Sequence, residues 1–158
     1  LASPGTVARE EIHLSIKPLK APGVSSGNRI AVSSKWIAKH PGDTGLVIHE
    51  LVHVVQDYQG KGEGWLVEGI ADYIRYAIYE GRPLEWFPTP DKADAFRSGY
   101  RPAAGLLFWL ETDRAPGIVR QLNRAMREGK STADIFKART GALPSALWQD
   151  YLVERSSG

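Results

Sequence analysis

The chain contains no cysteine, which excludes disulfide bonds, thiol catalysis and zinc sites built on cysteine. No apolar run approaches the roughly 20 residues that a membrane-spanning helix needs. The first ten residues lack the basic-then-apolar pattern of a signal peptide. Any metal site in this chain must therefore be built from His, Asp or Glu side chains.

The chain also lacks a strong excess of charge of either sign. It has 20 Lys and Arg against 18 Asp and Glu, a net charge of +2. The basic residues are scattered except for one loose cluster, whose pattern mostly indicates the solvated face of a helix: Arg114, Arg120, Arg124, Arg127 and Lys130. We therefore predict no nucleic-acid partner and no membrane partner, and nucleic-acid binding is kept as a third, weaker hypothesis.

The length and composition indicate one globular domain covering residues 1–158, with 42% hydrophobic residues available for a single core. The alternation of Ile12, Leu14 and Ile16 with polar residues predicts a half-buried strand. Residues 21–29, APGVSSGNR, predict a turn-rich loop, and residues 29–37 predict a second strand. The strand region is thus expected over about residues 10–37.

Helical patterns fill the rest of the chain. The first runs from about Gly45 to Gln59 and stops at Gly60, and a second covers residues 65–80. Further helices are predicted to start near Pro102, Pro116, Ser131 and Pro144. With a helical region over about residues 44–155, the predicted fold class is α+β and helix-dominated, with a small N-terminal sheet followed by helices.

The first of these helices carries the motif His-Glu-x-x-His. Positions four apart lie on one face of a helix, so His49 and His53 can present two imidazoles to one metal ion. Glu50 projects near the same edge, where a carboxylate can take a proton from water. The competing interpretation is a pair of ordinary core histidines.

A catalytic zinc ion needs a third protein ligand and an open position. A metzincin would carry Gly at position 56 and His at position 59, and Gln56 and Gln59 exclude that class. Glu68 lies fifteen positions after His53, far enough for a turn and an antiparallel return. Asp72 follows one turn later, where it can accept a hydrogen bond from a ligand histidine; the alternatives are a capping role or an ion pair with Arg75.

Three segments of the chain together resemble the basic secretory protein family of plants and bacteria: HELVHVVQDY, WLVEGIADYIRY and GYRPAAGLLFWLE. The resemblance covers roughly residues 10–155. It implies a zincin-like fold, secretion, and zinc peptidase activity of the gluzincin type. It also implies His49, His53 and Glu68 as ligands of one Zn²⁺ per chain, with Glu50 as the catalytic carboxylate.

The resulting hypothesis is a zinc-dependent peptidase acting on a peptide or protein substrate. Tyr100 is the first candidate to stabilise the oxyanion, and Tyr58 and Tyr73 are the second choices. The strand at 29–37 is expected to hold an extended substrate by edge pairing. The protein is expected to be secreted, with the signal peptide not present in this chain, and a monomer is favoured.

The main alternative is a non-catalytic secreted binding or defence module that retains a zinc site for stability. A closed structural site needs a fourth protein ligand, and no residue stands at an obvious spacing to supply it. Glu50 also favours catalysis, because a structural site does not use that carboxylate.

Overall fold

The computed structural model describes residues 11–58 and 62–157 of the chain. Within these residues the fold is α+β and helix-dominated, with a three-stranded sheet followed by seven α-helices. The strands are β1 (His13–Lys17), β2 (Gly23–Ser26) and β3 (Arg29–Ser33). The α-helices are α1 (Ser34–Lys39), α2 (Gly45–Gln56), α3 (Gly64–Asp72), α4 (Tyr100–Trp109), α5 (Ile118–Arg127), α6 (Thr132–Thr140) and α7 (Pro144–Ser156).

Short helical segments of other types connect or extend these helices. Two are π-helical, η1 (Tyr73–Tyr79) after α3 and η4 (Leu110–Arg114) after α4. Two are 3₁₀ turns, η2 (Leu84–Trp86) and η3 (Ala95–Ser98). No helix among the described residues combines the length and the apolar character that crossing a bilayer requires.

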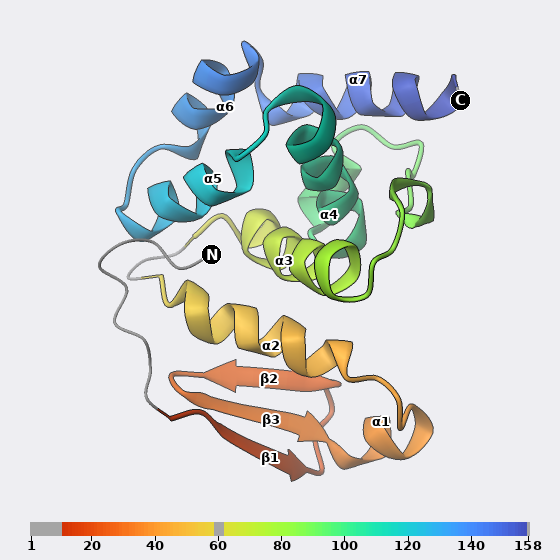
Figure 1. Ribbon diagram of the computed structural model, residues 1–158, viewed down its shortest axis with the longest axis vertical. Helices are drawn as coiled ribbons and strands as arrows, with labels where there is room; N and C mark the ends of the chain where they lie inside the picture. Colours follow the sequence, from red (N-terminus) through yellow and green to blue (C-terminus); the bar gives the residue numbers. More distant parts are fainter. Residues whose placement is uncertain (1–10, 59–61, 158) are drawn as a thin grey trace.

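The elements form layers, with α2 between the sheet and helices α3–α7, while α1 lies at the end of the sheet (Figure 1). Helix α2 packs on β2 and β3 on one side and on α3 and η1 on the other. The helix that carries the His-Glu-x-x-His motif therefore lies at the boundary between two parts of the molecule.

The strand order is β1-β3-β2, with β1 parallel and β2 antiparallel to β3. The prediction of a loop over residues 21–29 was wrong for Gly23–Ser26, where Val24 pairs with Ala31 of β3. The prediction that the second strand offers an edge to substrate was also wrong, because β3 is the central strand. Among the described residues, β1 and β2 form the two edges of the sheet.

The second strand is shorter than predicted. It ends at Ser33, whose side chain accepts a hydrogen bond from the N–H of Trp36 and so caps α1. Residues 34–37, expected to continue the strand, are helical for this reason.

Strand β1 forms where it was predicted, but the prediction that it is half-buried was wrong. The side chains of Leu14 and Ile16 are 55% and 64% exposed. Helix α2 packs on β2 and β3, and β1, at the edge of the sheet, extends past the helix, so its side chains stay exposed.

Helix α2 ends at Gln56, three residues before the predicted end. Asp57 adopts the left-handed conformation, with φ of 35°, and its N–H bonds the carbonyl of His53. The predicted stop at Gly60 lies outside the described residues. The second predicted helix is present, but it changes from α to π geometry after Asp72.

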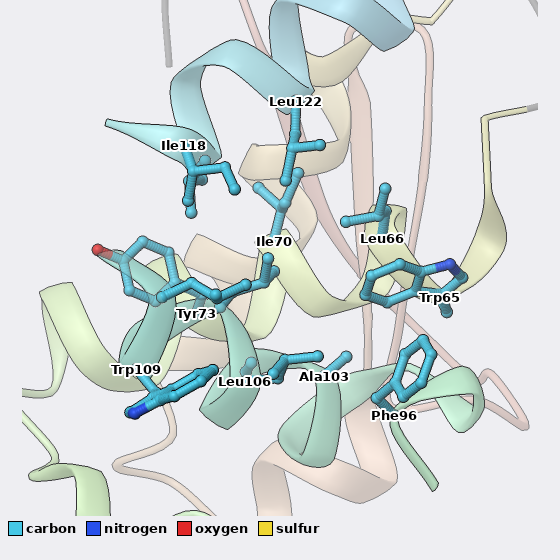
Figure 2. Packing of buried hydrophobic residues seen from close by; sticks show 14 of the residues in the cluster. Trp65, Leu66, Ile70, Tyr73, Phe96, Ala103, Leu106, Trp109, Ile118 and Leu122 are labelled. Atoms are coloured by element: carbon cyan, nitrogen blue, oxygen red, sulfur yellow. The ribbon is translucent and has the colours of Figure 1, made fainter. Parts of the chain in front are cut away.

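Two apolar clusters hold the layers together. The smaller one joins the sheet to α2 through four buried side chains: Ile30, Val32, Leu46 and Val54. The larger one lies among the helices, and Figure 2 shows Leu66 and Ile70 of α3 between Leu122 of α5 and Ala103 of α4. Helix α3 is thus the centre of the helical layer.

The crossing of α3 and α4 depends on a glycine. A Cβ built at Gly69 would lie 2.7 Å from the Cβ of Ala103, closer than real side chains approach. The two helices therefore contact through small residues, which fixes the position of α3 and of Glu68, the residue before Gly69.

Candidate metal centre

Three side chains from α2 and α3 converge on one point. The Nε2 atoms of His49 and His53 are 3.0 Å apart, and Glu68 Oε2 lies 3.3 Å and 3.5 Å from them respectively. In the described part of the chain, this is the group of His, Asp and Glu side chains whose spacing suits a metal ion. The structure thus brings together the three residues that the sequence indicated as ligands.

Each histidine ring is oriented by a partner on its other nitrogen. Nδ1 of His49 donates to Oδ1 of Asp72 at 2.8 Å, across the α2–α3 interface. Asp72 is 5% exposed, and its carboxylate accepts from His49, as the sequence hypothesis required. Because Nδ1 carries the proton, Nε2 of His49 is free to face the cluster.

The partner of His53 was not found from the sequence. Nδ1 of His53 lies 2.8 Å from Oε1 of Gln56, whose Nε2 donates to the carbonyl of Val67 at 3.0 Å. The donated bond identifies the amide oxygen as the acceptor of the His53 proton. The available signal was an amide three positions after His53 on the same helix, although in the sequence Gln56 indicated only that the chain is not a metzincin.

Without a bound cation, the charges of the site favour protonated histidines and an ionised Glu68. Burial lowers the pKa of His49, but the hydrogen bonds to Asp72 and Glu68 outweigh it and raise the pKa to about 9. Burial also lowers the pKa of His53, and hydrogen bonds to Glu68 and Gln56 reverse this to a net rise. Burial raises the pKa of Glu68, but hydrogen bonds from both histidines bring it down to about 2.

Glu50 is buried, with 6% of its surface exposed, and lines the same cavity as the three converging residues. Its carboxylate has no hydrogen-bond partner among the described residues. Strand β2 packs directly on it, since a Cβ at Gly23 would lie 2.8 Å from Oε1 and 3.0 Å from Cγ of Glu50. A carboxylate that faces a cavity and has no partner among the described residues is available for chemistry there.

Tyr100 stands beside the cluster at the start of α4. Its ring is nearly parallel to that of His49, with centroids 6.3 Å apart, and it is 53% exposed. Both Gly99 and Tyr100 have positive φ, 74° and 50°, a conformation that is strained for tyrosine. The negative charge of Glu68 raises the pKa of the Tyr100 hydroxyl, so the hydroxyl stays protonated and can donate.

The other two tyrosines named from the sequence are placed differently. Tyr58 borders the cavity, but its hydroxyl donates to Oδ1 of Asn123 at 2.8 Å. Tyr73 is 7% exposed and packs in the helical core (Figure 2), and it does not line the cavity that the histidines face. Of the three, Tyr100 has the hydroxyl that remains available to a ligand.

Comparison with known protein families adds an independent observation. A family model described as a peptidase of plants and bacteria matches residues 5–151. The chain belongs to this family. It is the basic secretory protein family that the three motifs resemble, and the match extends over the sheet as well as the helices. Comparisons with curated proteins and with solved structures find no match.

In this family member, the donor set fits a divalent cation. Both Nδ1 atoms are bonded to acceptors, so the two Nε2 atoms and a carboxylate oxygen of Glu68 are directed at one another at 3.0–3.5 Å. A cation can replace the protons that these atoms otherwise share, and two imidazoles with one carboxylate are typical of catalytic zinc sites.

A cavity of about 990 Å³ opens in front of the cluster. Strand β2 forms one wall of it through Gly23, Val24 and Ser25, and Trp36 and Tyr76 add aromatic surface. Within the described residues, the cavity therefore combines the candidate metal site, the carboxylate of Glu50 and the edge strand β2.

Proposed function

We propose that this chain is a zinc-dependent peptidase with a zincin-like fold. The observation that carries the proposal is the convergence of His49, His53 and Glu68 in a cavity that also holds the unpaired carboxylate of Glu50. Membership of a family described as peptidases supports the same reaction class.

Each residue of the site has its own role in the proposed reaction. His49, His53 and Glu68 would hold zinc, which when bound supplies Lewis acidity to a carbonyl group and to water. Glu50 takes a proton from the attacking water and passes it to the leaving amine. Tyr100 donates a hydrogen bond to the oxygen on which negative charge develops.

The substrate is proposed to lie along β2. This strand is an edge of the sheet and lines the cavity, so its free main-chain groups can pair with an extended peptide. This assignment replaces the strand at 29–37, whose two sides are occupied by β1 and β2. Secretion and a peptide or protein substrate are part of the proposal and rest on family membership.

The alternative of a non-catalytic module with a structural zinc site finds less support. Among the described residues the cluster offers three ligands, whereas structural zinc sites are closed by four. A nucleic-acid role is also disfavoured, because Arg124 and Lys130 both pair with Glu128, and Arg114 pairs with Glu154.

Two substitutions separate binding from catalysis. We expect Glu50→Gln to retain about one zinc per chain and to lose hydrolysis of a denatured protein by about 10²–10⁴-fold. Glu68→Ala should lose the metal as well as the activity. Zinc is measured by elemental analysis and hydrolysis by release of amines.

The exposed Asp91→Asn serves as the control and should behave like the wild type. Equal hydrolysis by wild type and Glu50→Gln would remove Glu50 from its role. Full zinc retention by Glu68→Ala would place the third ligand elsewhere, and zinc without hydrolysis in the wild type would favour the binding module.

A further inference from the structure

An apolar row lies exposed along β1 and the residue before it. The side chains of Ile12, Leu14 and Ile16 are 39%, 55% and 64% exposed. Leu14 pairs in register with Ile30, and Ile16 pairs with Val32, so the row continues the face on which β3 packs against α2. Single exposed apolar residues are ordinary, but three in a row on an edge strand are a recognised site of association.

No other strand of residues 11–58 and 62–157 pairs with the outer edge of β1. The N–H of His13 donates to the carbonyl of Asn28, so His13 turns its hydrogen-bonding groups toward β3. Since alternate residues of a strand direct these groups to opposite sides, Leu14 and Ile16 direct theirs outward. No proline interrupts the strand, and Lys17 at its end is the single charged residue within it.

The sequence of this edge is complementary to itself. If two copies pair antiparallel with Leu14 opposite Leu14, then Ile12 lies opposite Ile16 at both ends of the row. The same register places Glu11 opposite Lys17 twice. Both side chains are exposed. Glu11 lies 3.9 Å from Nε2 of His13, and Lys17 has no ion-pair partner among the described residues.

Hydrogen bonding between the strands favours this register over one shifted by two residues toward the C-terminus. A shift by two residues toward the C-terminus would set Ile12 opposite Pro18, which has no N–H to donate, and would separate the opposite charges. A shift by one residue would place the apolar side chains on opposite faces.

We propose that β1 is a homodimer interface, in which two copies join their sheets antiparallel across a two-fold axis at Leu14. The axis makes the contact isologous, so the same short strand serves both copies. The other edge of each sheet, β2, lines the cavity, so both candidate active sites stay open in the dimer. This proposal does not depend on the proposed function, and it departs from the monomer favoured by the sequence.

The interface is small, because a stable complex buries about 800 Å² per partner and the strand has five residues. We therefore expect a weak dimer whose fraction rises with concentration. Sedimentation equilibrium of the full chain over a wide concentration range measures its dissociation constant.

Charge exchange tests the register. In Glu11→Lys, two lysines face each other at each end of the interface, and in Lys17→Glu two glutamates do. Each variant alone should dimerise about tenfold more weakly than the wild type or worse. An equimolar mixture of the two variants restores opposite charges at both ends and should recover wild-type association, as should the double variant.

Lys35→Glu, an exposed position on α1, makes the same charge change away from the strand and should dimerise like the wild type. A wild-type chain that stays monomeric at every concentration would overturn the proposal, and it would mean that something other than a second copy covers the row. Unchanged dimerisation of the single variants, or no gain on mixing, would overturn it equally.

Discussion

The two histidines of the site are held in different ways. His49 depends on Asp72 from the neighbouring helix, whereas His53 depends on Gln56 from its own helix. The bond from Gln56 to the carbonyl of Val67 then ties α2 to α3 a second time. Partners of this kind fix the ring orientation and the protonated nitrogen, and their loss commonly weakens metal binding.

Gln56 is therefore expected to position His53. In Gln56→Leu the proton on Nδ1 loses its acceptor, and we expect zinc affinity to fall by about 10–100-fold. Competition with a chromophoric chelator measures this affinity. Gln56→Glu keeps an acceptor for His53 and should retain most of the affinity, which separates this role from a general loss of packing.

The matched control is Gln149→Leu, an exposed glutamine on α7, which should leave zinc affinity unchanged. Wild-type affinity in Gln56→Leu would show that the hydrogen bond to His53 does not position the ring.

At the scale of elements, the contact between β2 and α2 defines the geometry of the proposed reaction. Gly23 lets the strand approach the carboxylate of Glu50 without a side chain between them. The strand that is proposed to hold the substrate is therefore fixed directly against the proposed proton acceptor. The small cluster holds α2 on β3, and β3 in turn pairs with β2.

Gly23→Ala tests this close approach. The added methyl group would lie 2.8 Å from Oε1 of Glu50, so the carboxylate or the strand must shift. We expect kcat/KM for peptide hydrolysis to fall by about 10–100-fold, with zinc content unchanged. Steady-state kinetics and elemental analysis give the two readouts.

Gly42→Ala is the control for this prediction, because a Cβ there has no neighbour within 4 Å. If Gly23→Ala hydrolyses peptides at the wild-type rate, the contact between the strand and Glu50 has no part in the reaction.

At the scale of the whole molecule, the site connects two layers. His49 and His53 belong to α2, which packs on the sheet, and Glu68 belongs to α3, at the centre of the helical core. An ion bound by all three would bind the folded state and not the unfolded chain, so it would stabilise the protein as a whole.

This stabilisation is expected to depend on pH. In the metal-free protein the pKa of His49 is raised to about 9, so a proton must leave His49 when zinc binds below that pH. Each pH unit below 9 then weakens zinc binding by about tenfold, or about 1.4 kcal/mol. For a chain of this length, the rise in Tm caused by zinc should shrink by roughly 3–6 °C per pH unit.

Differential scanning calorimetry with zinc and with chelator, at each pH from 6 to 8, measures this increment. The Tm of the metal-free protein should change in the opposite direction. The stabilisation that protonated His49 contributes is fully present below about pH 6.5 and is lost as the pH rises through about 9. Glu68→Ala should show no increment at any pH. An increment that is equal at pH 6 and pH 8 would contradict proton displacement from His49.

The sequence by itself determined the features that depend on short-range periodicity. The spacing of His49, Glu50 and His53 predicted one helical face, and the spacing of Glu68 and Asp72 predicted a second helix that returns alongside it. The structure brings these side chains together, because each spacing is set within one helix and an apolar face holds each helix in place.

The tertiary structure decided what depends on partners far apart in the chain. Which strand lies at an edge follows from pairing between strands, so the sequence could not show that β3 is central and that β2 lines the cavity. The role of Gln56 depends on Val67 across an interface, and the strained conformation of Tyr100 depends on the packing of Gly99 against Glu68. Local periodicity fixes which way a side chain points from its own element, and only long-range packing fixes what it meets.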